Sequence, residues 1–170
     1  MIIRVTKNLE TKLKILPGSS LPMASNPLLD WSLLDFKIGR QSFLLVANTP
    51  SLFATVIPVT GVNIRTAWPD LLYEYLEKLF NGAGRGSCFR KYVSHEIENP
   101  VFSKSLNRSI LSSLNQIVYT VKVYFDTGLD DLDVITEHLN DNLWSAIAKP
   151  GEHYAHPKDA FAALMPPKNT

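Results

Sequence analysis

The chain has 170 residues, and its 17 Lys and Arg nearly balance its 16 Asp and Glu. No net basic charge is left to attract nucleic acid or an anionic membrane, so such binding would have to come from a local patch. The single cysteine, Cys88, excludes an internal disulfide and a zinc site built from several thiolates, and it fits a reducing compartment. We therefore expect one domain spanning residues 1–170 in the cytoplasm, with no membrane span and no targeting segment.

The first part of the chain predicts a strand, a short helix and a polar loop. Ile2 to Val5 is expected to form the strand, and Thr6 stands where its side chain can cap a helix from Lys7 to about Leu16. Pro17-Gly18 stops this helix. The segment that follows, as far as Pro27, is rich in Ser, Pro and Asn, which predicts a surface loop.

Three apolar runs follow, and together they predict an antiparallel meander. They cover residues 31–38, 41–47 and 52–59. Only Gly39-Arg40 separates the first two runs, a spacing typical of a two-residue hairpin turn. The third run is apolar on both alternating faces, which indicates an interior strand, and Pro58 marks the point where its ladder hydrogen bonds end.

Two long amphipathic segments predict the helices that cover this sheet. The first runs from about Thr66 to Asn81, with Pro69 in its first turn, where the missing N–H is no loss. The second, Asn107–Gly128, places its apolar residues on one broad face and has Asn107 or Ser109 as N-cap. Three shorter elements are expected: an edge strand at 101–103 and helices at 131–142 and 157–164. The predicted fold class is α+β, an antiparallel meander whose better face packs against the two long helices.

The segment from Asn107 to Gln116 carries a family resemblance. It reads N-R-S-I-L-S-S-L-N-Q and resembles the pattern N-R-S-V-L-G-S-M-N-D of a family of uncharacterised small proteins, known only as a domain of unknown function. The opening MIIRVTKNL, the segment from Asn26-Pro27 to Trp31 and the meander are also similar. Gln116 stands where the family has aspartate, which removes the one carboxylate of the motif that could act as an acid or base.

The resemblance implies no particular reaction, because the family has no assigned activity. Two further departures from its pattern are Ser112 in place of glycine and Leu114 in place of methionine. The spread of the family through bacteria, archaea and phages implies an accessory gene carried on phages, plasmids or integron cassettes.

The start of the central helix is the candidate site for an anionic ligand. Helix starts present free N–H groups and partial positive charge, so Arg108, Ser109 and nearby Lys104 could hold a phosphate or a carboxylate. Asn115 lies two turns further along the same polar side, and Tyr119 beside it could stack on a base. The competing interpretation is structural: Asn-x-Ser before an apolar run is ordinary capping, Arg108 can pair with an acidic residue, and Asn115 can bond a neighbouring loop.

Other polar motifs carry weaker signals. The segment GAGRGS at 82–87 has the composition of a phosphate-binding loop, but it follows a helix and lacks the Gly-Lys-Ser/Thr of a P-loop, so we interpret it as a flexible connection. His153 and His156 could share one metal ion, yet no second set of ligands stands out. We expect no metal and no cofactor, and we assign no catalytic residue.

The leading hypothesis is a small binding or interaction protein without catalysis of its own, whose partner is another protein or a second copy of the chain. Two tryptophans exposed together, from Trp31, Trp68 and Trp144, would mark a protein-binding patch. The alternative is an enzyme, or a protein with a phosphate or nucleotide ligand, that uses Arg108, Ser109 and Asn115 and has a concave pocket there. Sequence-specific binding of nucleic acid is the least favoured hypothesis.

Overall fold

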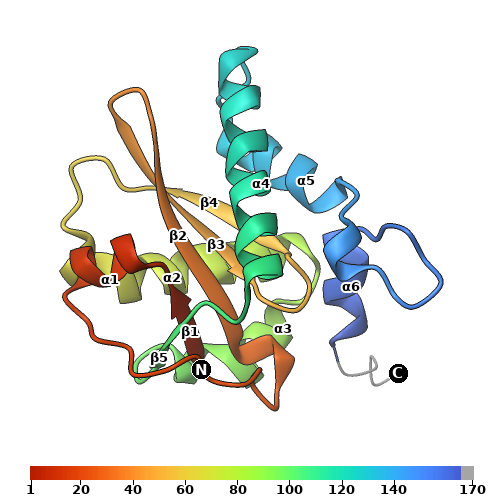
Figure 1. Cartoon of the computed structure of the whole chain (residues 1–170), viewed down its shortest axis with the longest axis horizontal. Helices are drawn as coiled ribbons and strands as arrows, with labels where there is room; N and C mark the ends of the chain where they lie inside the picture. Colours follow the sequence, from red (N-terminus) through yellow and green to blue (C-terminus); the bar gives the residue numbers. More distant parts are fainter. Residues whose placement is uncertain (166–170) are drawn as a thin grey trace.

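The computed structural model describes residues 1–165, which form a five-stranded sheet with helices on both of its faces (Figure 1). The strands lie in the order β4-β3-β2-β1-β5. Their bounds are β1 Ile2–Val5, β2 Asp30–Ile38, β3 Gln41–Asn48, β4 Ala54–Pro58 and β5 Val101–Lys104. β2, β3 and β4 form the predicted antiparallel meander, whereas β1 runs parallel to both β2 and β5. The sheet is therefore mixed, and the prediction of a purely antiparallel sheet is wrong.

The β2–β3 hairpin is formed as its two-residue turn predicts. Ile38 pairs with Gln41 across the turn, and the register continues to Trp31 opposite Asn48. Gly39 has a φ of 56°, in the left-handed region that glycine adopts without steric cost.

Six α-helices connect and cover the strands within residues 1–165. They are α1 Lys7–Leu13, α2 Ile64–Gly82, α3 Gly86–Cys88, α4 Arg108–Asp126, α5 Leu132–Asp141 and α6 Pro157–Ala163. None of these helices combines the length and the apolar character that a membrane span requires. The glycine-rich segment after α2 turns directly into α3, which continues as one π-helical turn over Phe89–Val93 and a 3-10 turn over Ser94–Glu96.

Two helix ends differ from the sequence-based expectation. α1 stops at Leu13, because Lys14 adopts a left-handed conformation, and Leu16 beyond it is 98% exposed. Thr6 precedes α1 but its side chain makes no capping hydrogen bond. α2 begins two residues earlier than predicted, so Pro69 lies inside the helix and not in its first turn.

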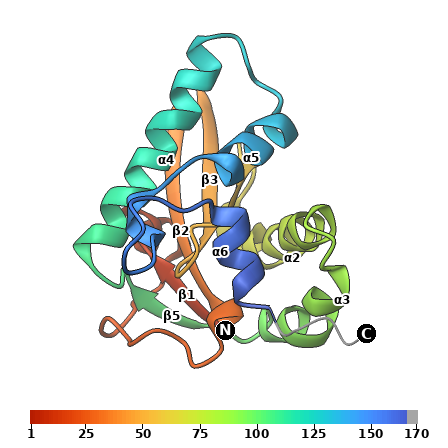
Figure 2. The same ribbon diagram turned by 90° about the vertical axis from the view of Figure 1, so that its right-hand side faces the viewer.

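The two long helices lie on opposite faces of the sheet, α4 on one and α2 on the other (Figure 2). In the first core, Ile3, Leu33, Leu44 and Ile57 of the sheet pack with Leu72, Leu76 and Phe80 of α2. In the second core, Leu34, Leu45 and Val56 pack with Leu114, Ile117 and Val121 of α4. Both faces of the central strands are apolar, so each face requires its own cover. The expectation that both long helices pack on one face is therefore wrong.

β4 is an edge strand, although its apolar sequence predicts an interior one. α5 lies beside β4 (Figure 1). At Ala54, the side chain of Asn140 makes the two hydrogen bonds that a neighbouring strand would make. Asn140 Oδ1 accepts a hydrogen bond from the Ala54 N–H and its Nδ2 donates to the Ala54 carbonyl, both at 2.8 Å. Val56 is 1% exposed in the core with α4 and α5, and Ile57 is 0% exposed in the core with α2, so the strand is buried on both faces although it lies at the sheet edge.

Candidate functional site

The start of α4 is capped by Asn107, whose Oδ1 accepts a hydrogen bond from the Ile110 N–H at 2.9 Å. Arg108, Ser109 and Lys104 are exposed around this cap. The side chains of Arg108 and Lys104 make no hydrogen bond or ion pair with any residue in 1–165, so no contact supports the interpretation that Arg108 fastens the helix start to the sheet. Asn107 therefore caps the helix, whereas the exposed positive charges beside the cap belong to Arg108 and Lys104.

An exposed stripe runs along α4 from Arg108 to Lys122. Asn115 and Tyr119 lie between these two cations at helical spacing, and the Tyr119 side chain is 69% exposed. Asn115 forms no hydrogen bond to a loop within the described residues. The stripe is a convex helix surface, and the residues that line the cleft described below come from α2, β4, α5 and α6.

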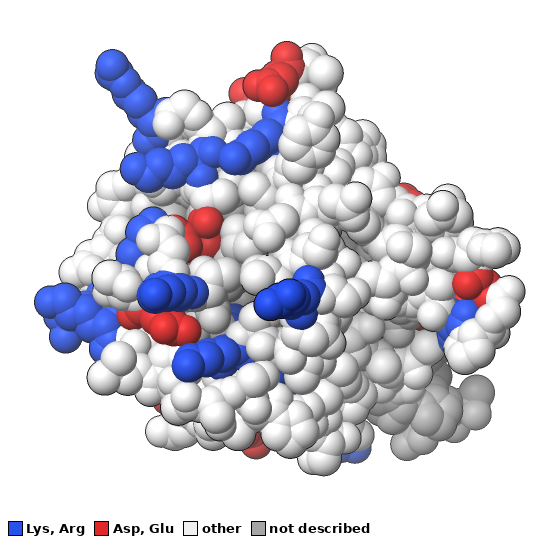
Figure 3. All heavy atoms as spheres, viewed as in Figure 1, with Lys and Arg blue, Asp and Glu red and all other residues white. Residues whose placement is uncertain are grey.

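Basic side chains gather on the face of the molecule that α4 and the β2–β3 hairpin present (Figure 3). Eight exposed Lys and Arg belong to α1 and its C-cap, the hairpin, β5 and α4: Lys7, Lys12, Lys14, Lys37, Arg40, Lys104, Arg108 and Lys122. Outside the buried Arg4–Asp30 pair, three acidic residues accompany them on these elements: Glu10, Asp35 and Asp126. We call this surface the basic face. Its excess of five positive charges contrasts with a net charge of +1 for the whole chain.

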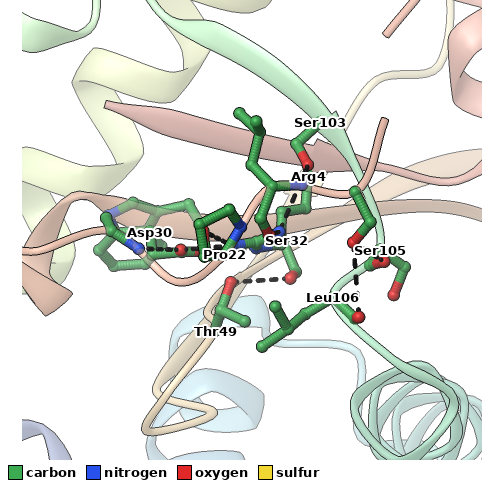
Figure 4. Close-up of polar contacts among 12 residues, drawn as sticks. Arg4, Pro22, Asp30, Ser32, Thr49, Ser103, Ser105 and Leu106 are labelled. Carbon is green, nitrogen blue, oxygen red and sulfur yellow. Dashed lines mark hydrogen bonds and ion pairs between the residues drawn. The ribbon is translucent and has the colours of Figure 1, made fainter. Parts of the chain in front are cut away.

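A buried arginine holds the loop beside this face, a feature that the sequence analysis missed. Arg4 of β1 donates from Nε and Nη2 to the two carboxylate oxygens of Asp30, each at 2.7 Å, and the two side chains are 1% and 0% exposed (Figure 4). The same guanidinium donates to the carbonyls of Leu21 and Pro22 at 2.9 and 3.0 Å, and to Ser103 Oγ at 3.3 Å. The loop after α1 is thus tied to the sheet.

This network also positions the approach to α4. Ser103 Oγ on β5 accepts from the Leu21 N–H at 3.0 Å, and the Ser20 hydroxyl donates to the Ser105 carbonyl at 3.0 Å. The loop after α1 is therefore bonded to the buried Arg4 through Leu21 and Pro22, and through Ser20 to the segment that leads to the cap at Asn107. Arg4 supports the geometry of the basic face without being exposed on it.

A cleft of about 430 Å³ is lined by residues of α2, β4, α5 and α6. Figure 2 shows how these three helices lie around the β4 side of the sheet. Its apolar wall includes Phe53 and Leu79, which are 5% and 6% exposed. Two ion pairs cross its rim. Lys78 of α2 contacts Asp133 of α5 at 2.6 Å, and Lys158 of α6 contacts Asp141 of α5 at 2.5 Å.

Four titratable groups of this cleft have shifted pKa values. The hydrogen bond to Asp133 raises the pKa of Lys78, and the bond between Lys158 and Asp141 raises the pKa of the amine and lowers the pKa of the carboxyl. Burial, followed by the charge of Glu74, raises the pKa of the Tyr75 hydroxyl, which stays protonated at neutral pH. The sequence signal for this site is the spacing of Asp133, Glu137 and Asp141, four residues apart along α5.

The histidine pair is not assembled into a metal centre in residues 1–165, where no group of three or more His, Cys, Asp and Glu side chains is placed to share an ion. His156 Nδ1 instead lies 2.6 Å from the Asp141 carbonyl, and His153 is exposed. The tryptophans form no exposed pair: Trp31 is fully buried, Trp144 is 9% exposed, and Trp68 is half-buried against Phe102. Two tryptophans exposed together would have marked a protein-binding patch, and the described residues contain no such pair.

Comparison with known proteins places the chain in a family without adding an activity. A family model described as a domain of unknown function (DUF6933) matches residues 2–160, which confirms the resemblance to such a domain. No curated protein and no solved structure matches the chain. The match includes Arg4 and Asp30, the whole of α4, and the cleft residues on α2 and α5. The chain belongs to the DUF6933 family.

Proposed function

We propose that the protein is a non-catalytic binding protein that docks an acidic protein surface on its basic face. The observation that carries this proposal is the exposed stripe of α4, where Tyr119 stands between Arg108 and Lys122 and neither cation is paired within the described residues. Tyr and Arg are the residue types that most often dominate protein interfaces, because they bury a large area and also present polar groups.

Charge and apolar area together favour a protein partner over a nucleic acid. Val123, next to the stripe, is 38% exposed and adds apolar area beside Tyr119. Proteins that bind duplexes neutralise roughly 6 to 10 phosphates, whereas the basic face has an excess of five charges and Lys12 on it is already paired with Asp35. An acidic protein surface requires fewer contacts, and its charges steer association to this face. An accessory role of this kind agrees with carriage on a mobile element, which the family resemblance implies.

The test uses a defined acidic probe and two charge-matched double variants. The probe is a labelled peptide of Glu and Leu, compared with its Gln and Leu counterpart and with a single-stranded oligonucleotide of equal charge. We expect the double variant Arg108→Glu/Lys122→Glu to weaken binding of the acidic peptide by about tenfold or more, and we expect the same of the separate single variant Tyr119→Ala. The control Arg90→Glu/Lys149→Glu changes the net charge by the same amount, away from the basic face, and should leave that binding within about twofold.

Two results would overturn the proposal. Equal weakening by the control variant would show that net charge alone attracts the peptide. Tighter binding of the oligonucleotide than of the acidic peptide would assign the face to nucleic acid. In a separate experiment, binding of inorganic phosphate is compared between the parent and Arg108→Ala. This comparison tests the predicted small-anion site of Arg108, Ser109, Lys104 and Asn115.

A further inference from the structure

The cleft between α2, α5 and α6 is separate from the basic face, and its lining is suited to a small molecule. Its volume of about 430 Å³ lies within the usual range of ligand pockets, roughly 300–1,000 Å³. Phe53 supplies an aromatic wall that is held rigidly, because its ring stacks on Phe161 with centroids 4.4 Å apart. Asn140, at the back of the cleft, is fixed by its two hydrogen bonds to Ala54. The wall is therefore already formed.

The charged side chains around the cleft favour a positively charged ligand over a negatively charged one. Three carboxylates line it, from Asp133, Glu137 and Asp141, against two ammonium groups, from Lys78 and Lys158. Both lysines are already paired with aspartates, and the side-chain carboxylate of Glu137 makes no hydrogen bond or ion pair with another residue in 1–165. A ligand with an amine can therefore pair with Glu137 without breaking an existing contact. A ligand with a carboxylate can pair with Lys78 or Lys158 only after that lysine has separated from its aspartate.

The existing pairs do not close the cleft permanently. All four partners are more than half exposed, with side-chain exposures of 61% and 68% for Lys78 and Asp133, and 51% and 57% for Lys158 and Asp141. Exposed ion pairs contribute little to stability, so they rearrange at small cost when a ligand enters. Tyr75, protonated at the wall, can donate or accept a hydrogen bond with the ligand.

We propose that this cleft binds a small organic cation, a molecule with an apolar or aromatic body and one protonated amine or guanidinium. The body packs against Phe53 and Leu79, and the cationic group pairs with Glu137. The proposal is independent of the docking function of the basic face, because the two surfaces share no residue.

The test uses three probes that have the same aromatic body: 2-phenylethylamine, 2-phenylethanol and 3-phenylpropionate. Binding is followed by the amide resonances of the full chain in ¹⁵N–¹H NMR spectra. We expect the amine to shift the resonances of Thr136, Glu137 and Asn140 with a dissociation constant on the order of 1 mM, as for a fragment-sized ligand. The alcohol should bind about two- to fivefold more weakly, and the carboxylate more weakly still.

The variant Glu137→Gln should bring the affinity of the amine down to that of the alcohol and leave the alcohol unchanged. The matched control Glu98→Gln removes one exposed carboxylate elsewhere and should leave the preference for the amine intact. The assignment fails if no probe shifts the cleft resonances at tens of millimolar, if the three probes bind equally, or if the carboxylate binds best. Because Glu137 is exposed, its substitution is not expected to unfold the chain, and the comparison of probes with the unmodified protein tests the proposal in any case.

Discussion

Arg4 and Asp30 form a bidentate ion pair between two parallel strands, and the interior of the protein encloses both charges. Asp30 Oδ2 also accepts a hydrogen bond from the Ala24 N–H at 2.9 Å, while Arg4 donates to the carbonyls of Leu21 and Pro22. The desolvation of the two charges is thus offset by their mutual contact and by hydrogen bonds to the backbone of one loop. The pair therefore defines the path of the loop as well as joining β1 to β2.

Replacing Arg4 by Met should lower the free energy of unfolding by about 3 to 5 kcal/mol, because Asp30 is then left buried without its counter-charge. The double variant Arg4→Met/Asp30→Leu should cost less than the two single variants combined, since no charge remains in the interior. Denaturant unfolding measures both effects. Arg108→Ala is the matched control on the surface and should stay within about 0.5 kcal/mol of the parent. A near-neutral Arg4→Met would contradict a buried, paired guanidinium.

Asn140→Ala should destabilise the fold by about 1 to 3 kcal/mol, because the N–H and the carbonyl of Ala54 lose their partner at a covered sheet edge. Asn140→Asp keeps an acceptor for the Ala54 N–H but loses the donor to the Ala54 carbonyl, so it also removes a hydrogen bond. Hydrogen exchange of the Ala54 amide distinguishes the two variants. Fast exchange in Asn140→Ala with retained protection in Asn140→Asp is expected, and equal protection in both would argue against the role of Asn140.

The amphipathic patterns of the sequence predicted where α4, α5 and the β2–β3 hairpin lie, because the periodicity of apolar residues follows the backbone geometry directly. The position of β4 at the sheet edge could not be predicted in that way. Its residues are apolar on both sides because α2 and α5 cover them. At Ala54, the hydrogen bonds of a neighbouring strand are made instead by the side chain of Asn140, 86 residues away. The pattern of apolar residues in a strand indicates that the strand is buried, but it does not indicate whether another strand or a helix buries it.

The candidate sites show the same difference between local and long-range information. Arg108, Asn115 and Lys122 share one side of α4 as their spacing predicts, because that relationship is fixed within one helix. The cleft joins side chains of four elements, and the pairing of Lys78 with Asp133 spans 55 residues. The charged residue inside the apolar strand Ile2–Val5 was a usable signal of a buried partner, but nothing local identified Asp30 as that partner.

Leu114→Ala should cost about 2 to 5 kcal/mol, because Leu114 is 2% exposed in the core between α4 and the sheet and its truncation leaves a cavity. Lys122→Ala, on the exposed side of the same helix, should stay within about 0.5 kcal/mol. Thermal or denaturant unfolding of the two variants checks the orientation of α4. Similar losses for both would mean that α4 is turned differently about its axis.

The ion pair between Asp141 and Lys158 predicts a limited pH window for its contribution to stability. The hydrogen bond from Lys158 holds the pKa of Asp141 below its ordinary value of 3.8, so the contribution is present above that pH and is lost as the pH falls through the folded-state pKa. The same contact raises the pKa of Lys158 above 10.5, so at the alkaline end the contribution is lost as the pH rises through that higher value. Between these limits it should not change.

Asp141→Asn should therefore be slightly less stable than the parent at neutral pH, with a difference that disappears in strongly acidic solution and shrinks in high salt, because both side chains are more than half exposed. Carboxyl ¹³C titration gives the direct measurement. In Lys158→Met the pKa of Asp141 should move back up toward 3.8, whereas Lys149→Met, which removes a cation that makes no ion pair within residues 1–165, should leave it unchanged. An Asp141 titration that is the same in Lys158→Met as in the parent would mean that Lys158 does not hold α6 against α5, and the rim of the cleft would then be open on that side.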